Sequence, residues 1–160
     1  ARRIRERIDQ LAQVLADRIA GQPCEVDDIF CRHYGAGLPD PAHALALLRE
    51  AAGPELQALT QHTSLAALPS DAHHALWRLA ALYLVHRSPQ PGGDPVARFH
   101  LDNGARLERL NAQANLSTNG LKQSAGLMVN YLYDLARIET CHDRFVRGRV
   151  VHSRALSALL

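Results

Sequence analysis

His100 and Tyr133 are the two side chains of this sequence whose types suit proton chemistry in one site. A histidine imidazole ordinarily has a pKa of about 6.5, so it can act as a general acid near neutral pH without further adjustment. A tyrosine hydroxyl is a neutral hydrogen-bond donor that can orient either a substrate or a histidine. The two residue types together indicate a proton donor and an orienting hydroxyl, provided that the fold brings them to one cleft.

Two short elements would have to position this pair. Asp94-Pro95 is a strong helix start and Asn103-Gly104 suits a helix end, so we expect a helix of about two turns that carries His100. The segment 127–135 alternates in the manner of a strand, and this alternation places Tyr133 on the same face as Leu127, Val129, Tyr131 and Leu135. Met128, Asn130, Leu132 and Asp134 would then occupy the opposite face. The simpler alternative is that His100 packs on its helix against a backbone carbonyl and that Tyr133 is an ordinary strand aromatic.

The rest of the chain reads as helices, which predicts a mainly α-helical α+β protein. Apolar periodicity and breakers predict helices at 2–20, 25–34, 40–52, 55–60 and 70–85, then a loop at 88–93. A strand at 105–111 and the strand at 127–135 form the expected C-terminal β-hairpin, with a polar loop at 115–124 and helical sequence after 135. We expect a helical region 1–87 and a second region 94–160, packed as one compact unit.

Composition limits the classes of function. The net charge of +2 is too small for a nucleic-acid footprint, although the cluster Arg2, Arg3, Arg5 and Arg7 leaves a nucleic-acid binder as a weaker alternative. No apolar run reaches the roughly 20 residues of a membrane span, and no secretory signal is visible, so we expect no membrane partner. Three cysteines are too few for a disulfide framework, which favours a cytoplasmic protein. The apolar stripe of the first helix suggests a homo-oligomer formed through helical faces.

Cys24, Cys31 and His33 have side chains of types that can ligate a metal ion. Their C-x₆-C-x-H spacing matches no established zinc pattern, and no second pair of ligands follows at a suitable distance. We therefore expect no metal and no resident cofactor.

Two motifs give the sequence a family resemblance. The stretch DPVARFHLDNGARLERLN and the run QSAGLMVNYLYDL resemble malonyl-CoA decarboxylase, with weaker similarity in LWRLAALYLVHR and RIETCHDRFV. The catalytic domain of that family is similar to the acyl-CoA-binding N-acetyltransferase fold, so the resemblance implies that this segment forms the last core helix and the closing hairpin. It also implies that the Phe-His of the family signature falls on Phe99-His100 and the second tyrosine of its NY-x-Y motif on Tyr133.

The resemblance implies the decarboxylation of malonyl-CoA to acetyl-CoA and carbon dioxide. Loss of carbon dioxide leaves a thioester enolate, which needs oriented donors near its oxygen and an acid that protonates carbon. His100 is the expected proton donor and Tyr133 the expected orienting donor, with Asn130 and Ser124 as candidate substrate-binding residues; coenzyme A enters as the substrate's thioester. Arg98, Arg106 and Arg137 could meet its phosphates, but none is assigned this role.

The family's serine segment, Leu-Ser-Pro-x-Pro-Gly-Phe, and its catalytic glutamate are not found in these residues. We therefore expect the chain to be the C-terminal piece of a longer enzyme. The alternative is a non-catalytic remnant of the family that serves as a helical interaction module or an acyl-CoA-binding module.

Overall fold

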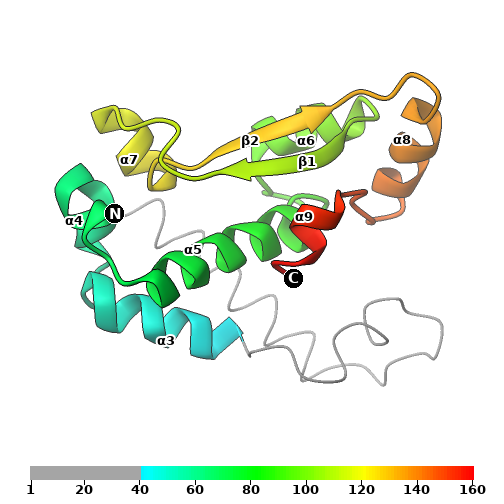
Figure 1. Cartoon of the computed structure of the whole chain (residues 1–160). Helices are drawn as coiled ribbons and strands as arrows, with labels where there is room; N and C mark the ends of the chain where they lie inside the picture. The colour runs from blue at the N-terminus through cyan, green and yellow to red at the C-terminus, as the bar shows by residue number, and fades with distance from the viewer. Residues whose placement is uncertain (1–40) are drawn as a thin grey trace.

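The computed structural model describes residues 41–160 (Figure 1). The helices expected at 2–20 and 25–34, the arginines of the first of them, and Cys24, Cys31 and His33 lie outside the described residues. The elements follow the order α3 (Pro41–Ala52), η1 (Gln57–Thr60), α4 (His62–Ala66), α5 (Ser70–Leu82), η2 (Tyr83–Arg87), α6 (Pro95–Asp102), β1 (Arg106–Asn111), α7 (Thr118–Ser124), β2 (Met128–Leu132), α8 (Ile138–Val146) and α9 (Arg154–Ser157). The prediction of a mainly helical α+β protein with a C-terminal hairpin is confirmed.

Helix α5 lies at the centre of the described part. Helix α3 packs along one side of it, and the β1–β2 hairpin lies on the other side, with α7 at one end and α8 at the opposite end (Figure 1). Helix α9 packs on β1, and α6 contacts both β1 and α8. The helix that carries His100 is therefore held between the hairpin and the C-terminal helices.

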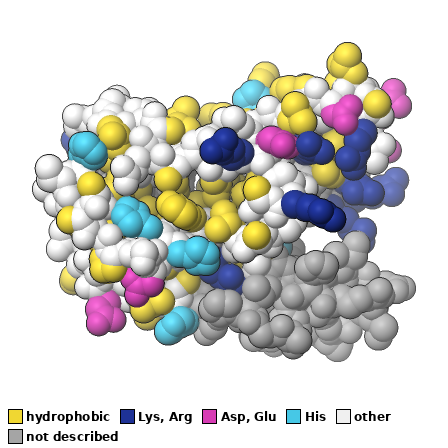
Figure 2. Space-filling view, in the orientation of Figure 1, with side chains coloured by type: hydrophobic (Ala, Val, Ile, Leu, Met, Phe, Trp, Pro, Cys, Tyr) yellow, Lys and Arg dark blue, Asp and Glu magenta, His cyan; other side chains and the backbone are white. Residues whose placement is uncertain are grey.

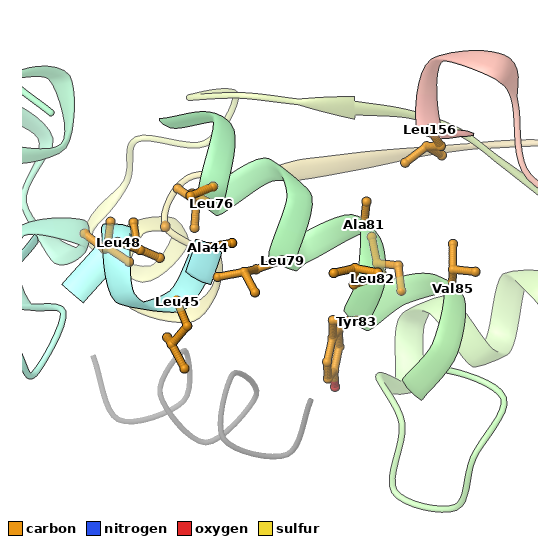
Figure 3. Close-up of a cluster of buried hydrophobic side chains, with 14 of the residues drawn as sticks. Ala44, Leu45, Leu48, Leu76, Leu79, Ala81, Leu82, Tyr83, Val85 and Leu156 are labelled. Carbon is orange, nitrogen blue, oxygen red and sulfur yellow. The ribbon is translucent and has the colours of Figure 1, made fainter. Parts of the chain in front are cut away.

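The core forms where apolar stripes of helices meet. Helical spacing puts Leu76, Leu79 and Leu82 on the buried side of α5, and each is at most 5% exposed. Leu48 of α3 and Leu156 of α9 belong to the same buried cluster and reach it from different elements (Figure 3). Burial of each leucine contributes about 1.5–3 kcal/mol, so this cluster stabilises the arrangement that supports the hairpin.

The hairpin is antiparallel and contains one irregularity. Leu107 pairs with Tyr131 and Arg109 with Asn130, so a register shift falls between Leu107 and Arg109. In β2 the side chains alternate as predicted: Val129 and Tyr131 are half-buried, whereas Met128, Asn130 and Leu132 are exposed. The expected faces are therefore confirmed for Met128–Leu132, whereas Tyr133 and Leu135 lie beyond the strand and are exposed.

The prediction of a polar loop at 115–124 is wrong, because helix α7 occupies Thr118–Ser124. The hydroxyl of Ser117 accepts a hydrogen bond from the backbone N–H of Gly120 and caps the helix. Leu121 is buried and anchors the helix to the core. Polar composition concealed this helix because it is short and buries only one face.

Other boundaries also differ from the expectation. The second strand ends at Leu132, since Asp134 then closes a turn in which its carboxylate accepts from the Ala136 N–H and its carbonyl from the Arg137 N–H. After α8 the chain is not continuously helical: His152 bridges to Leu107 beside β1, and only Arg154–Ser157 returns to a helix. Helix α5 ends at Leu82, three residues before the expected end at 85, and Tyr83–Arg87 continues as the π-helical turn η2.

Candidate functional site

Helix α6 positions His100 through both of its ends. The carboxylate of Asp94 accepts hydrogen bonds from the N–H groups of Val96 and Ala97, and Pro95 occupies the first turn, as predicted. At the other end the N–H of Ala105 donates to the carbonyl of His100 at 3.0 Å. This hydrogen bond joins the end of α6, at His100, to Ala105, the residue that precedes β1.

The side chains of His100 and Tyr133 meet. The distance from His100 Nδ1 to Tyr133 Oη is 2.9 Å, a hydrogen bond whose donor depends on the imidazole tautomer. Tyr133 is 40% exposed and His100 is half-buried, so the pair lies at the surface of the molecule. The imidazole is not enclosed by core leucines, and its hydrogen bond is to a phenol instead of a backbone carbonyl.

A second tyrosine, not among the site residues predicted from the sequence, completes the surroundings of the imidazole. The Tyr131 ring stacks on the His100 ring with centroids 4.3 Å apart and an interplanar angle of 17°. The Phe99 ring meets the imidazole edge-on at 5.3 Å. Tyr131 and Tyr133 are two positions apart, and both rings contact the imidazole although Tyr133 lies one residue beyond the end of β2. The spacing of two residues between Tyr131 and Tyr133 is the sequence signal from which a role for Tyr131 could have been predicted.

Beside this group lies a pocket of about 330 Å³ between α5 and the hairpin. Its walls are mostly apolar, and the space-filling view shows hydrophobic side chains in a hollow of this face (Figure 2). Tyr131 lines the pocket, whereas His100 and Tyr133 do not. The pocket and the His100–Tyr133 pair are thus neighbours that share the residue Tyr131. Its other lining residues include Leu76, Leu79, Ala80, Leu84, Leu110, Ala125, Leu127 and Val129.

The two candidate substrate-binding residues are placed differently. Ser124 lines the pocket, and its hydroxyl bonds to the carbonyls of Leu127 and Gly120 at 2.8 and 3.1 Å. Asn130 lies on the opposite face of β2 from Tyr131, where its side-chain oxygen accepts from Asn111 at 2.9 Å. The structure therefore brings Ser124 to the pocket and leaves Asn130 outside it, and both roles stay predictions.

Two of the arginines considered for phosphate binding make local contacts. Nη1 of Arg98 donates to three successive carbonyls, those of Ser88, Pro89 and Gln90, at 3.0–3.2 Å. Arg106 forms an ion pair with Glu108 at 2.8 Å. Arg98 thus organises the 88–93 loop that precedes α6.

Two general findings concern residues 41–160. Within them, no three histidine, cysteine, aspartate or glutamate side chains converge where they could hold a metal ion. None of the helices in this part of the chain has the length and apolar character needed to cross a bilayer.

The arrangement defines a helix-and-hairpin unit with a histidine–tyrosine pair next to an apolar pocket. The family model of the malonyl-CoA decarboxylase C-terminal domain matches residues 40–160, which is most of the chain. The chain belongs to this family, and the resemblance seen in the sequence is confirmed.

Known relatives agree with this assignment. The chain is 45% identical over 64 residues to the mitochondrial malonyl-CoA decarboxylase of Anser anser anser. The aligned region is 39% of this chain and 13% of that protein. It is 49% identical over 61 residues to the mitochondrial enzyme of Rattus norvegicus, covering 38% of this chain and 12% of the rat protein.

Solved structures extend the match. The match to the malonyl-CoA decarboxylase of Cupriavidus metallidurans has a TM-score of 0.58 and 31% sequence identity. It covers 96% of this chain and 36% of the relative's chain. The match to the malonyl-CoA decarboxylase of Rhodopseudomonas palustris has a TM-score of 0.55 and 39% sequence identity. It covers 76% of this chain and 31% of the relative's chain. The chain therefore spans about a third of the length of the solved relatives it matches.

Proposed function

We propose that this chain contributes to the decarboxylation of malonyl-CoA, with His100 as the proton donor and Tyr133 as the orienting donor. The observation that carries the proposal is the 2.9 Å contact between His100 Nδ1 and Tyr133 Oη, made between two elements that meet only in the folded chain. Family membership supports the reaction class, since the relatives that match are malonyl-CoA decarboxylases.

The reaction assigns a distinct task to each side chain. The bond between the carboxylate and the α-carbon breaks, carbon dioxide leaves, and the electron pair remains as a thioester enolate. An imidazolium at His100 donates its Nδ1–H to the oxygen of Tyr133, which leaves its Nε2–H to protonate the carbon. The phenolic oxygen of Tyr133 accepts this hydrogen bond and orients the imidazole, and its O–H is left to donate to a substrate group away from the protonated carbon. Water reprotonates the imidazole at this exposed site.

The pocket suits the uncharged part of the substrate. Its mostly apolar walls match a pantetheine arm better than a phosphate group or a free carboxylate. Ser124 lies in its lining, where its hydroxyl oxygen could accept a hydrogen bond from an amide of the arm. The chemistry requires neither a metal nor a redox cofactor.

The second candidate is a non-catalytic module that binds an acyl-CoA or a partner protein. The specific observation in its favour is that the apolar pocket is lined by neither His100 nor Tyr133. Formation of a homo-oligomer through helical faces and a cytoplasmic setting stay predictions under either candidate.

Release of labelled carbon dioxide from malonyl-CoA by the 160-residue chain tests the proposal. We expect His100→Ala to lower the rate by about 10²- to 10⁴-fold, the usual contribution of proton transfer. His43→Ala, at an exposed position of α3, is the matched control and should retain the rate of the unaltered chain. Equal background rates for the unaltered chain and His100→Ala would end the catalytic assignment. Binding of malonyl-CoA without turnover would then support the acyl-CoA-binding module.

A further inference from the structure

Tyr131 occupies a position between the imidazole and the pocket. Its ring stacks on His100 at 4.3 Å, and the same residue contributes to the pocket lining. Because Tyr131 pairs with Leu107 in the hairpin, the strand register determines where its ring stands. Leu107 is fully buried, which holds this register against the core.

We propose that Tyr131 is a positioning residue for the decarboxylation: its ring holds the His100 imidazole in the plane from which Nε2 reaches the substrate. The inference rests on the proposed function and extends it to a residue that does not itself touch the reacting atoms. Tyr131 acts on the imidazole by stacking, whereas Tyr133 acts on it through the hydrogen bond to Nδ1.

The physical reason is that a single hydrogen bond does not define the direction of an imidazole. The torsion that turns a histidine ring is broad, with no sharp staggered minimum. Contact with Tyr133 fixes only the position of Nδ1, and the ring can still swing about that atom. A near-parallel stack at 17° removes this freedom, because tilting the imidazole would drive it into the Tyr131 ring. The two tyrosines together therefore define where Nε2 points.

Phe99 offers a comparison on the other side. Its ring also contacts the imidazole, but edge-on at an interplanar angle of 79°, and the side chain is 64% exposed. An exposed ring that meets an edge can move with the imidazole and restricts it little. Phe99 is therefore the aromatic neighbour whose removal should leave the orientation of His100 intact.

The shared ring also connects substrate binding to acid orientation. A pantetheine arm in the pocket would pack against Tyr131 from the pocket side and limit its motion. Occupancy of the pocket would then tighten the stack on His100 at the moment when the acid is needed.

Side-chain NMR of the 160-residue chain carrying labelled histidine tests the proposal without requiring turnover. The ring current of Tyr131 shifts the carbon-bound protons of His100 upfield. We expect Tyr131→Phe to retain this shift, Tyr131→Leu to lose it, and Phe99→Leu to change it little. An unchanged His100 signal in a folded Tyr131→Leu chain would overturn the proposal. If its backbone amide signals show that Tyr131→Leu does not fold, Tyr131→Met replaces it.

Carbon dioxide release supplies the second measurement. In Tyr131→Leu we expect kcat to fall by about tenfold or more, because the acid is then misplaced. The change in KM should be smaller. Tyr131→Phe should restore kcat, since the stack needs the ring and not the hydroxyl. An unchanged kcat in Tyr131→Leu would overturn the proposal. If the unaltered chain releases no carbon dioxide, the decarboxylase function itself has failed, and the NMR shifts then decide whether Tyr131 stacks on His100 in solution.

Discussion

Gly104 lies so close to Ile138 that a Cβ atom at Gly104 would stand 2.5 Å from the Ile138 carbonyl oxygen. The Gly104 backbone also has a φ of +82°, in the left-handed region that favours glycine. This residue links α6 to β1 directly after the helix that carries His100, and Ile138 begins α8. Close approach of two backbones at this point therefore sets the position of α6 in the molecule.

Gly104→Ala should lower the free energy of unfolding by about 2–5 kcal/mol, because it adds the cost of a left-handed backbone to a steric clash. Urea denaturation measures the change. Gly148→Ala is the matched control: its φ is +77°, but nothing lies within 4 Å of an added Cβ. Only the backbone cost of about 1–2 kcal/mol applies there. Equal losses in the two variants would contradict the role given to the Ile138 contact.

Tyr133→Phe should leave the fold intact and remove the hydrogen bond to His100. We expect carbon dioxide release to fall by about 10²-fold, because the imidazole loses the hydrogen bond that directs its Nε2 toward the substrate. The free energy of unfolding should change by no more than about 1.5 kcal/mol, since this is one hydrogen bond at a partly exposed site. Leu135→Ala is the control in the same segment, where the side chain is 87% exposed. Retention of the full rate by Tyr133→Phe would rule out the orienting role.

Arg98→Ala should destabilise the loop at 88–93 and the start of α6. Three backbone carbonyls lose one charged donor, a change worth about 1.5–3 kcal/mol. The free energy of unfolding and amide hydrogen exchange in 88–97 measure the effect. Arg109→Ala, at an exposed position of β1, should change stability by no more than about 0.5 kcal/mol. If Arg98→Ala is as mild as Arg109→Ala, the loop does not depend on this guanidinium.

Gln113→Gly should stabilise the chain. Gln113 is exposed and has a φ of +50°, a conformation that costs a residue with a Cβ about 1–2 kcal/mol. Glycine removes that cost but loses about 0.5–1 kcal/mol through its freer unfolded state, so the net gain should be about 0.5–1 kcal/mol. A thermal melt compares it with Gln113→Ala, which keeps the strain and should show no such gain. A lower melting temperature for Gln113→Gly would contradict this account.

Much of the local structure could be predicted from the sequence because its causes are local. Asp94-Pro95 and Asn103-Gly104 delimit α6 through capping and backbone preference, which act over a few residues. Alternation in 128–132 likewise predicted the faces of β2. Helix α7 was missed because its single buried anchor, Leu121, gives no periodic signal over so short a span.

The sequence by itself determined where α6 begins and ends, the existence of the C-terminal hairpin, and the presence of one histidine and one tyrosine suited to proton transfer. Only the tertiary structure decided that these two rings meet, that Tyr131 stacks on the imidazole, and that Asn130 faces away from both. The physical reason is that such contacts depend on how α6 is set against β2. That setting comes from the backbone contact at Gly104, the register shift after Leu107 and the packing of the buried core, none of which local spacing encodes.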